Sequence, residues 1–354
     1  MLDTSSSLPV SRRRLLSGVS ALVAAPLAWS QTPPQPELKS VRIGVGGKTS
    51  LYHLPLALAE QLGYFKAEGL AVELKAHAGG GLAAQALAQA QLDVAAGGFE
   101  HTLFLRQKNL PCRAFVLYGR APQIVFGVSA RTLPEFQNLQ QLNGRRIGIS
   151  SPDSSTQWVA QVVLVRGGVP RDSVEYVNVG TGTGAVMAVR EGRVDALSNS
   201  DPAISALEFS GELRVLADTR SLRGTQEVFG GPMPGGCLYA PQEFMQRYPK
   251  TVQALTNAMV RALTWLQTAG PSDLVRVVPE ASMHGDRAIY LAAFDKAREA
   301  FSPDGLISED NVRTALRTLA RFGNPTNAQW PMAAPITLFY TNQFAQRAKQ
   351  RFQA

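Results

Sequence analysis

The amino-acid sequence predicts an α/β protein of two related lobes, each a mainly parallel sheet flanked by helices. The sequence RIGV at residues 42–45 returns as RIGI at residues 146–149, and Leu92-Asp93 returns as Val194-Asp195. In both copies, strand-like apolar runs alternate with helix-like runs, the order typical of parallel sheets. The copies lie farther apart than the roughly 20–50 residues of a solenoid repeat. The duplication therefore predicts two lobes that face each other across a cleft.

The first copy supplies the elements of one lobe. Residues 54–62 carry apolar side chains at helical spacing, and Gly63 follows as a C-terminal cap. The other runs are short and apolar, or rich in alanine, as expected of buried strands and of a packed helix. The complete prediction is strands at 41–45, 70–74 and 92–96, and helices at 54–62 and 82–90.

The second copy repeats this order of elements. The prediction is strands at 146–149, 174–177 and 194–197, and helices at 156–166 and 185–191. After Pro241 the apolar residues fall at three- and four-residue steps, as in Val252, Leu255 and Met259, which predicts helices packed on a core.

Two segments are predicted to carry the chain between the lobes. The strand-like runs 112–117 and 124–128 are separated by a stretch that contains Gly119 and Pro122, and residues 217–223 follow the second copy. With these two crossings as a hinge, residues 41–121 plus 224–354 form lobe one and residues 122–223 form lobe two. Residues near Arg120, Pro122, Thr219 and Arg220 are expected to absorb any rotation of the lobes.

Residues 1–30 differ from the rest and predict an export signal. Arg12, Arg13 and Arg14 precede an apolar stretch, and small residues at Ala28 and Ser30 fit a cleavage site. Paired arginines are typical of the twin-arginine route. The apolar stretch is too short for a membrane span, and Gly18 and Pro26 interrupt it. We therefore expect an exported, periplasmic protein.

Charge and cysteine content restrict the function classes. The 354 residues carry a net charge of +8, but no Lys/Arg run follows the signal segment, which argues against nucleic-acid binding. A modest positive field suits an anionic small ligand, and it equally suits solubility. Cys112 and Cys237 lie in strand-like runs, and the sequence leaves open whether they pair or remain two buried thiols.

Six loops are predicted to line the cleft. Ligands of open parallel sheets bind beyond the carboxyl ends of the strands, where loops meet helix N-termini. In the sequence these loops are 46–53, 78–81, 97–101, 150–156, 180–184 and 198–202. Glycines such as Gly80 and Gly81 let backbone amides approach a ligand, and helix N-termini favour an anion. The same glycines and serines also occur as ordinary caps and turns.

Metal and enzyme motifs are incomplete. His53, His77 and His101 fall at or beside lobe-one loops with Glu100, but their spacing is not a compact zinc motif. Whether they cluster stays open. Gly47-Lys48-Thr49 resembles the end of a phosphate loop, yet Arg42 stands where a glycine is required. We therefore expect no metal, no cofactor and no catalytic residue.

The aromatic residues beside the loops can be interpreted in two ways. Tyr52, Phe99 and Trp158 can stack on a heteroaromatic ring or can pack in the core.

The ordered motifs resemble the solute-binding proteins of nitrate/sulfonate/taurine-type ABC importers, whose fold is shared by binding proteins for thiamine precursors. The resemblance covers most of residues 41–267. In lobe one it rests on His53-Leu54-Pro55, residues 63–70, 79–81 and 92–95; in lobe two it rests on residues 142–148, 154–156, 192–196 and 217–220. It is specific for the family and not for the ligand.

The resemblance implies a type II periplasmic-binding-protein fold with a two-crossover hinge. It implies a monomer that captures a solute, expected to be a sulfonate or carboxylate anion, and delivers it to an ABC permease and ATPase. The matching ligand positions are the loops at Tyr52, His53, Gly80, Gly81, Phe99 and Glu100 in lobe one, and Ser154, Ser155, Thr156, Thr181 and Asp201 in lobe two. The alternatives are a secreted enzyme or a sensor of the same fold, acting on or binding a pyrimidine-like compound. The cysteine-rich motif of the related pyrimidine synthases is missing.

Overall fold

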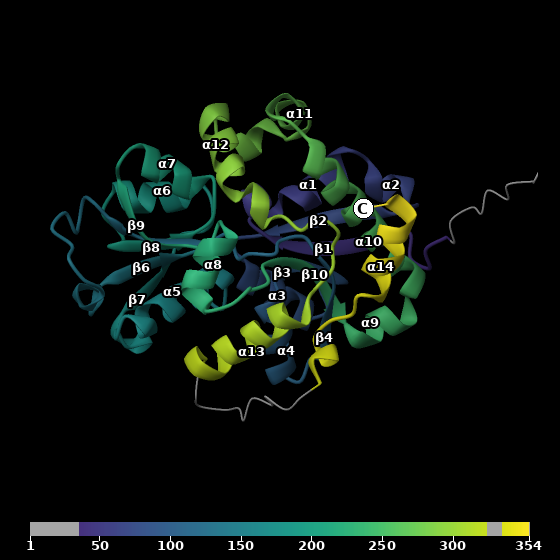
Figure 1. Ribbon diagram of the computed structural model, residues 1–354, viewed down its shortest axis with the longest axis horizontal. Coiled ribbons are helices and arrows are strands. Elements are labelled where there is room, and N and C mark those ends of the chain that lie inside the picture. The colour runs from purple at the N-terminus through teal and green to yellow at the C-terminus, as the bar shows by residue number, and fades with distance from the viewer. Residues whose placement is uncertain (1–34, 324–334, 354) are drawn as a thin grey trace, which may run out of the picture. The chain divides into compact units, whose positions relative to one another are not determined.

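The computed structural model describes residues 35–323 and 335–353, so the predicted signal segment lies outside the described residues. Within the described ranges, no helix is long and apolar enough to cross a membrane. The fold is built on two five-stranded sheets (Figure 1).

The first sheet belongs to lobe one. Its strand order is β2-β1-β3-β10-β4, with β1 parallel to β2 and β3. Alternate residues of β1 and β3 reach opposite faces, so Val94 and Ala96 join one apolar core while Ala95 joins another. The strands are β1 (Ser40–Gly46), β2 (Ala71–His77), β3 (Val94–Gly98), β4 (Cys112–Leu117) and β10 (Gly236–Pro241).

The second sheet repeats the first with different strands. Its order is β7-β6-β8-β5-β9, with β6 parallel to β7 and β8. The order has the same form as that of lobe one, which agrees with the duplication seen in the sequence. The strands are β5 (Val125–Ser129), β6 (Arg146–Ile149), β7 (Glu175–Asn178), β8 (Ala196–Asn199) and β9 (Leu213–Asp218).

One strand of each sheet runs antiparallel, which the prediction of mainly parallel sheets did not specify. Strand β10 inserts antiparallel between β3 and β4, and β5 inserts antiparallel between β8 and β9. Each is the first strand after a crossing, because β5 follows β4 of lobe one and β10 follows β9 of lobe two. A strand that arrives from the other lobe enters its sheet from the cleft end, so it runs opposite to the strands that start at the far end.

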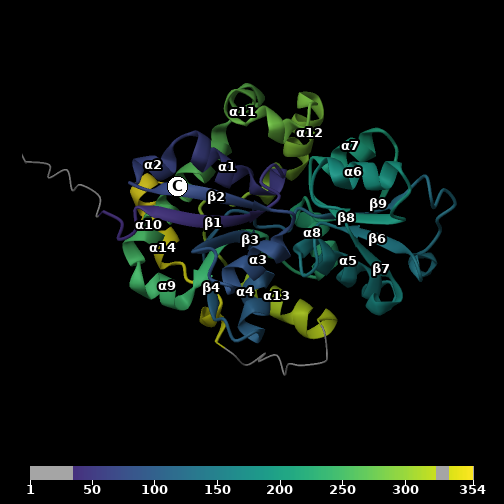
Figure 2. The same ribbon diagram turned by 180° about the vertical axis from the view of Figure 1, so that it is seen from behind.

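Helices cover both faces of both sheets (Figures 1 and 2). The two apolar cores of lobe one place α1, α2, α9, α10, α11, α12 and α14 on one face and α3, α4 and α13 on the other. In lobe two, α6 and α7 lie on one face and α5 on the other. The helices of lobe one are α1 (Leu54–Gln61), α2 (Tyr64–Ala67), α3 (Gly80–Ala88), α4 (Glu100–Gln107), α9 (Gln242–Arg247), α10 (Pro249–Thr268), α11 (Pro271–Val277), α12 (Arg287–Ala297), α13 (Glu309–Phe322) and α14 (Gln343–Phe352).

The remaining helices are short or belong to lobe two and the crossings. The α-helices are α5 (Ser155–Arg166), α6 (Thr183–Arg190), α7 (Ala203–Phe209) and α8 (Leu222–Phe229), and the 3₁₀ turns are η1 (Leu51–His53), η2 (Leu139–Leu142), η3 (Arg171–Ser173), η4 (Glu280–Met283), η5 (Arg298–Ala300) and η6 (Ile336–Leu338). Side chains cap several N-termini as short polar residues do: Ser154 caps α5, Ser221 caps α8, Asp286 caps α12 and Ser308 caps α13.

The duplicated sequence motifs build a duplicated ion pair. In lobe one, Arg42 Nη2 lies 2.8 Å from Asp93 Oδ1, and in lobe two Arg146 Nη2 lies 3.1 Å from Asp195 Oδ1. In each pair the backbone N–H of the arginine also donates to the carboxylate. The pair ties the start of the first strand to the loop before the third strand, which explains why Arg and Asp recur at these places in both copies.

The two crossings lie side by side. Thr219 Oγ1 accepts a hydrogen bond from the Ile124 N–H at 2.9 Å and donates to the Ile124 carbonyl at 2.7 Å. The Gln123 N–H donates to the Thr219 carbonyl at 3.0 Å. Thr219 is fully buried. The segments expected to form the hinge are thus joined directly to each other.

Candidate functional site

The predicted loops of the two lobes meet around a small cavity of about 30 Å³. Its lining is mostly glycine and hydroxyl-bearing residues contributed by both lobes, and the aromatic groups come from lobe one. The lining residues are Gly46, Ser50, Tyr52, His53, Gly80, Gly97, Gly98, Ile124, Ser150, Ser154, Ser155, Thr156, Thr181 and Ser200.

The lobes touch directly in this structure. Ser50 Oγ and Ser200 Oγ lie 2.8 Å apart, and the Leu51 N–H donates to the Asp201 carbonyl at 2.9 Å. His101 Nε2 lies 3.3 Å from the Asp153 carbonyl oxygen. Each of these contacts joins a lobe-one loop to a lobe-two loop. The structure is therefore a closed arrangement of the cleft.

Glycines at the start of α3 permit this closeness. A Cβ built on Gly81 would overlap the Pro152 carbonyl oxygen of lobe two, and one built on Gly79 would overlap the Ser151 side chain. Neither glycine has a positive φ, so glycine is needed at these positions for space rather than for backbone conformation. Gly81 therefore lies at the contact between the lobes, while Gly80 lines the cavity.

His53 is held in one neutral tautomer. Its Nε2 lies 3.2 Å from the Gly46 carbonyl oxygen and its Nδ1 lies 2.9 Å from the Tyr118 hydroxyl. A carbonyl only accepts, so Nε2 carries the proton and Nδ1 accepts from Tyr118. Burial lowers the pKa of His53 to about 4, despite its bond to the Gly46 carbonyl. The imidazole is therefore uncharged at neutral pH.

Tyr52 lines the cavity, and its hydroxyl group is buried. Its ring packs edge-on against His53 with ring centroids 4.9 Å apart. The side chain is 8% exposed, and its hydroxyl has no hydrogen-bond partner among the described residues. A buried hydroxyl without a partner costs free energy, so this group is available to a ligand.

Glu100 and Phe99 come from the third lobe-one loop but differ in role. Glu100 begins α4, is 4% exposed, and its carboxylate accepts a hydrogen bond from the Ser155 hydroxyl of lobe two. Phe99 is fully buried within an apolar core and does not line the cavity. Stacking of Phe99 on a ligand therefore has no support from its position.

The hydroxyl-rich loop of lobe two forms a compact network before α5. The Ser150 N–H donates to Thr156 Oγ1 at 2.8 Å, and Ser154 Oγ lies 2.7 Å from the same oxygen. Ser154 also caps α5 by accepting from the Gln157 N–H. Thr181 lines the cavity ahead of α6. These residues present hydroxyls and a helix N-terminus to the cleft.

The Asp201 carboxylate pairs with Arg220, and Asp201 is not part of the cavity lining. Arg220 Nη1 lies 3.3 Å from Asp201 Oδ2 and 2.7 Å from Glu208 Oε2, and its Nη2 lies 2.5 Å from Asp218 Oδ2. The Asp201 and Arg220 side chains are each 3% exposed. Burial alone would lower the pKa of Arg220, but the hydrogen bonds to Asp218 and Glu208 raise it. The cluster is a structural ion-pair network beside the crossing.

The histidines and cysteines, left open by the sequence, form neither a metal site nor a bridge. No group of metal-binding side chains is found in residues 35–323 and 335–353. Cys112 and Cys237 are both buried free thiols. Burial raises the pKa of Cys112 to about 12, so this thiol is not a reactive thiolate at neutral pH.

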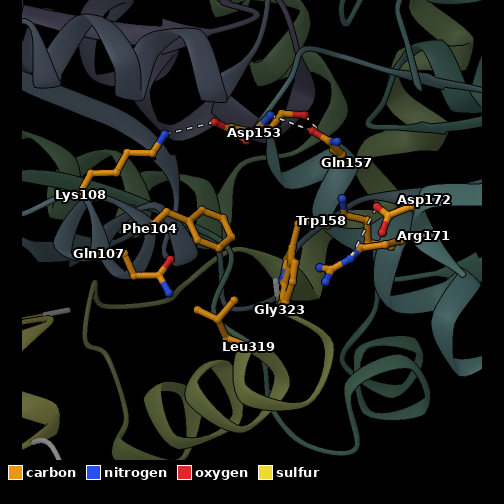
Figure 3. A pocket seen from close by; sticks show the side chains of 12 residues that line it. Phe104, Gln107, Lys108, Asp153, Gln157, Trp158, Arg171, Asp172, Leu319 and Gly323 are labelled. Atoms are coloured by element: carbon orange, nitrogen blue, oxygen red, sulfur yellow. Dashed lines mark hydrogen bonds and ion pairs between the residues drawn. The ribbon is translucent and has the colours of Figure 1, made fainter. Parts of the chain in front are cut away.

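A second cavity, of about 310 Å³, also has Ser154 in its lining (Figure 3). Phe104 of α4 and Trp158 of α5 meet edge-on there, with ring centroids 5.8 Å apart. Figure 3 shows Asp153 between Lys108 and Gln157, and Lys108 Nζ lies 3.2 Å from Asp153 Oδ2. Trp158 therefore borders this outer cavity and not the small central one.

Several cleft residues were not singled out from the sequence. Ser50, Ser150 and Ser200 lie in loops that the strand-end rule selected, but serine is too common in turns to be chosen individually. Tyr118, the partner of His53, follows the last residue of β4. The sequence analysis did not assign residues 112–117 to the sheet of lobe one. With that assignment, the rule that ligands lie beyond strand ends would have indicated Tyr118.

The family model described as "NMT1/THI5 like" matches residues 50–269. The chain belongs to this family. The NMT1/THI5-like chain is 46% identical to a protein of known structure from Bordetella bronchiseptica RB50, with 91% of this chain and 100% of that chain covered and a TM-score of 0.87.

Two more distant structures share the fold of this NMT1/THI5-like chain. The alkanesulfonate-binding protein SsuA of Xanthomonas axonopodis pv. citri, bound to MOPS, is 18% identical over 86% of this chain and 99% of its own, with a TM-score of 0.64. The periplasmic nitrate-binding protein NrtA of Synechocystis PCC 6803 is 13% identical over 90% of both chains, with a TM-score of 0.67. The predicted family and the two-lobed periplasmic-binding-protein fold are thereby confirmed.

Proposed function

We propose that the protein is the periplasmic solute-binding component of an ABC importer, closing its two lobes on a small organic molecule. The observation that carries the proposal is the cavity between the lobes, lined by residues of both. A ligand that contacts both lobes stabilises the closed state because its binding free energy is greatest there. The names of the sulfonate- and nitrate-binding structures that share the fold support the same role.

The proposed partners follow from this role. The closed protein would dock as a monomer on an ABC permease and its ATPase. The paired arginines of the first thirty residues support export by the twin-arginine route.

We propose that the solute carries an anionic group, a sulfonate or a carboxylate. The N-termini of α3 and α5 both border the cavity, at Gly80 and Ser155. Their free N–H groups and the surrounding hydroxyls are donors that suit an anion. The cavity of about 30 Å³ is far below the roughly 300 Å³ at which ligand pockets begin, so the cleft that holds the solute must be wider than in this structure.

A thermal-shift screen tests the proposal. The panel contains alkanesulfonates, aromatic and aliphatic carboxylates, and pyrimidines. A ligand at 100 times its dissociation constant is expected to stabilise the protein by about 2.7 kcal/mol. If only a pyrimidine raised the melting temperature, the anionic class would be wrong.

The role of binding rather than catalysis has its own test. Any compound that stabilises the protein is incubated with it and followed by NMR. We expect the compound to be recovered unchanged, and its conversion would instead support the secreted-enzyme alternative.

A further inference from the structure

His101 joins the two lobes through a buried imidazole ring. It lies in the first turn of α4 and is 1% exposed. Its Nδ1 lies 3.1 Å from the carbonyl oxygen of Gly98 in lobe one, and its Nε2 lies 3.3 Å from the carbonyl oxygen of Asp153 in lobe two. A Cβ built on the cavity-lining Gly80 would lie 3.0 Å from the ring, so the ring lies directly behind the cavity wall.

A neutral imidazole cannot satisfy both of these contacts. A carbonyl oxygen only accepts hydrogen bonds, and a neutral histidine has one N–H donor and one nitrogen with a lone pair. In either neutral tautomer, a lone pair of His101 therefore faces a carbonyl oxygen. The positively charged ring has two N–H donors and satisfies both carbonyls. His53 differs, because one of its nitrogens faces the Tyr118 hydroxyl, which can donate.

A buried carboxylate beside His101 favours a positive ring. Glu100, the preceding residue, is 4% exposed, and its carboxylate accepts a hydrogen bond from the neutral Ser155 hydroxyl. A Cβ built on Gly98 would overlap this carboxylate, so the carboxylate lies beside the residue whose carbonyl faces His101. None of the residues that line the cavity is a lysine or an arginine. A protonated His101 supplies the positive charge that the cavity lining does not.

The other titratable groups packed against the ring are neutral or paired with each other. On β10, the Tyr239 ring centroid lies 6.0 Å from that of His101. Burial raises the pKa of the Tyr239 hydroxyl, and that of the Cys237 thiol on the same strand, well above their ordinary values. In lobe two, the Asp153 carboxylate forms an exposed ion pair with Lys108. The charge of Lys108 is thus offset, and these groups do not oppose a positive His101.

Parting of the lobes removes the need for the second ring proton. The Gly98 carbonyl belongs to the same lobe as His101, so Nδ1 keeps its acceptor when the cleft opens. The Asp153 carbonyl moves away with lobe two, and Nε2 can then accept a hydrogen bond from water. A neutral ring therefore satisfies the open form, while the closed form needs a charged ring.

We propose that closure of the cleft takes up one proton on His101, so that acid pH favours the closed, solute-holding state. The inference rests on the proposed function and adds to it a dependence of solute capture on pH. A histidine exposed to water titrates near pH 6.5, so both forms are charged well below that pH. Above it, each unit of pH lowers the ratio of closed to open protein by up to about tenfold, until the closed form also loses its proton.

Nitrogen NMR of a protein locked in the closed form tests the proposal without a solute. Ser50 Oγ and Ser200 Oγ lie 2.8 Å apart, so the double change Ser50→Cys, Ser200→Cys allows a disulfide to hold the lobes together. At about pH 8 the oxidised protein should show two protonated ring nitrogens for His101, and the reduced protein should show one. His101→Gln in the same protein identifies the signals. A neutral His101 ring in the oxidised protein, or a ring that reduction leaves unchanged, would overturn the proposal.

Small-angle X-ray scattering supplies a second measurement, which does not need the disulfide. Without solute, the radius of gyration of the wild type should be smaller near pH 6 than near pH 9, and His101→Gln should remove most of this difference. His284→Gln is the matched control, because His284 also lies against lobe two, at Gly182, and burial lowers its pKa. This control should keep the difference. No response to pH in the wild type, or an equal response in His101→Gln, would contradict the proposal.

The outcomes separate this inference from the proposed function. Neither measurement contains a solute. If compounds of the thermal-shift panel bind but His101 is neutral in the locked protein, the inference fails while solute binding stands. If no compound of that panel binds, the proposed function fails, whatever the charge of His101.

Discussion

Arg220 has a structural role, because it is the centre of a buried ion-pair network. It contacts three carboxylates, and the Asp201 carboxylate is as deeply buried as Arg220 itself. Removing one partner of a buried ion pair is costly because the other charge stays buried without compensation.

Arg220→Met should therefore lower the free energy of unfolding by about 3 kcal/mol or more, measured by urea denaturation. Arg223→Met is the matched control. Arg223 pairs with Glu227 on the surface and is 90% exposed, so its loss should cost less than about 1 kcal/mol. Equal effects of the two changes would contradict the account.

The duplicated ion pair allows the same change to be compared in two settings. The Asp195 side chain is 4% exposed and that of Asp93 is 21% exposed. Asp195→Asn should cost about 2 kcal/mol of unfolding free energy and Asp93→Asn about 1 kcal/mol. A larger loss of unfolding free energy for Asp93→Asn than for Asp195→Asn would show that burial does not determine how much each ion pair stabilises the fold.

The loss of unfolding free energy caused by Asp195→Asn should depend on pH. Burial acts to raise the pKa of Asp195, but the hydrogen bonds and charge of Arg146 lower it overall. A carboxylate with a lowered pKa stabilises the folded state above its ordinary pKa and loses this effect as pH falls through the lowered value. The difference between wild type and Asp195→Asn should therefore be full at pH 7 and shrink below about pH 4, as followed by urea denaturation.

At the residue scale, the sequence indicated which loops line the cavity between the lobes, but not what each side chain contacts. The strand-end rule selected the loops of Tyr52, His53, Ser154 and Thr181, which line the cavity. It could not show that the Asp201 carboxylate is taken by Arg220, because Arg220 lies after the next strand and the contact depends on tertiary packing.

At the element scale, the N-terminus of α3 decides how closely the lobes approach. Gly81 packs against the Pro152 carbonyl oxygen of the opposite lobe. The positions of the strands near this helix, and of the strand-like run that forms β5, were predicted within a few residues, but the antiparallel direction of β5 and β10 was not. Strand direction depends on the lobe from which the chain arrives, and no local pattern records that.

Gly81→Ala should hinder closure while leaving lobe one folded. Alanine favours a helix over glycine by about 1 kcal/mol, but its methyl group would overlap the opposite backbone. We expect at least a tenfold loss of solute affinity by calorimetry with no loss of thermal stability in the free protein. The control is Gln85→Ala, an exposed position of the same helix, which should leave affinity unchanged.

At the scale of the whole molecule, the duplicated sequence corresponds to duplicated topology. The orders β2-β1-β3-β10-β4 and β7-β6-β8-β5-β9 are the same arrangement built from different parts of the chain. The sequence predicted this, because the repeated motifs mark equivalent strands. It did not predict the closed contact between Ser50 and Ser200, which depends on the relative position of two lobes.

Small-angle X-ray scattering of the wild-type protein and Gly81→Ala tests the central claim, that the lobes close on a solute, most directly. Each protein is measured alone and with the alkanesulfonates, carboxylates and pyrimidines of the thermal-shift panel. At least one compound should reduce the radius of gyration of the wild type and reduce it less in Gly81→Ala. An unchanged radius with every compound, or an equal reduction in both proteins, would contradict the account.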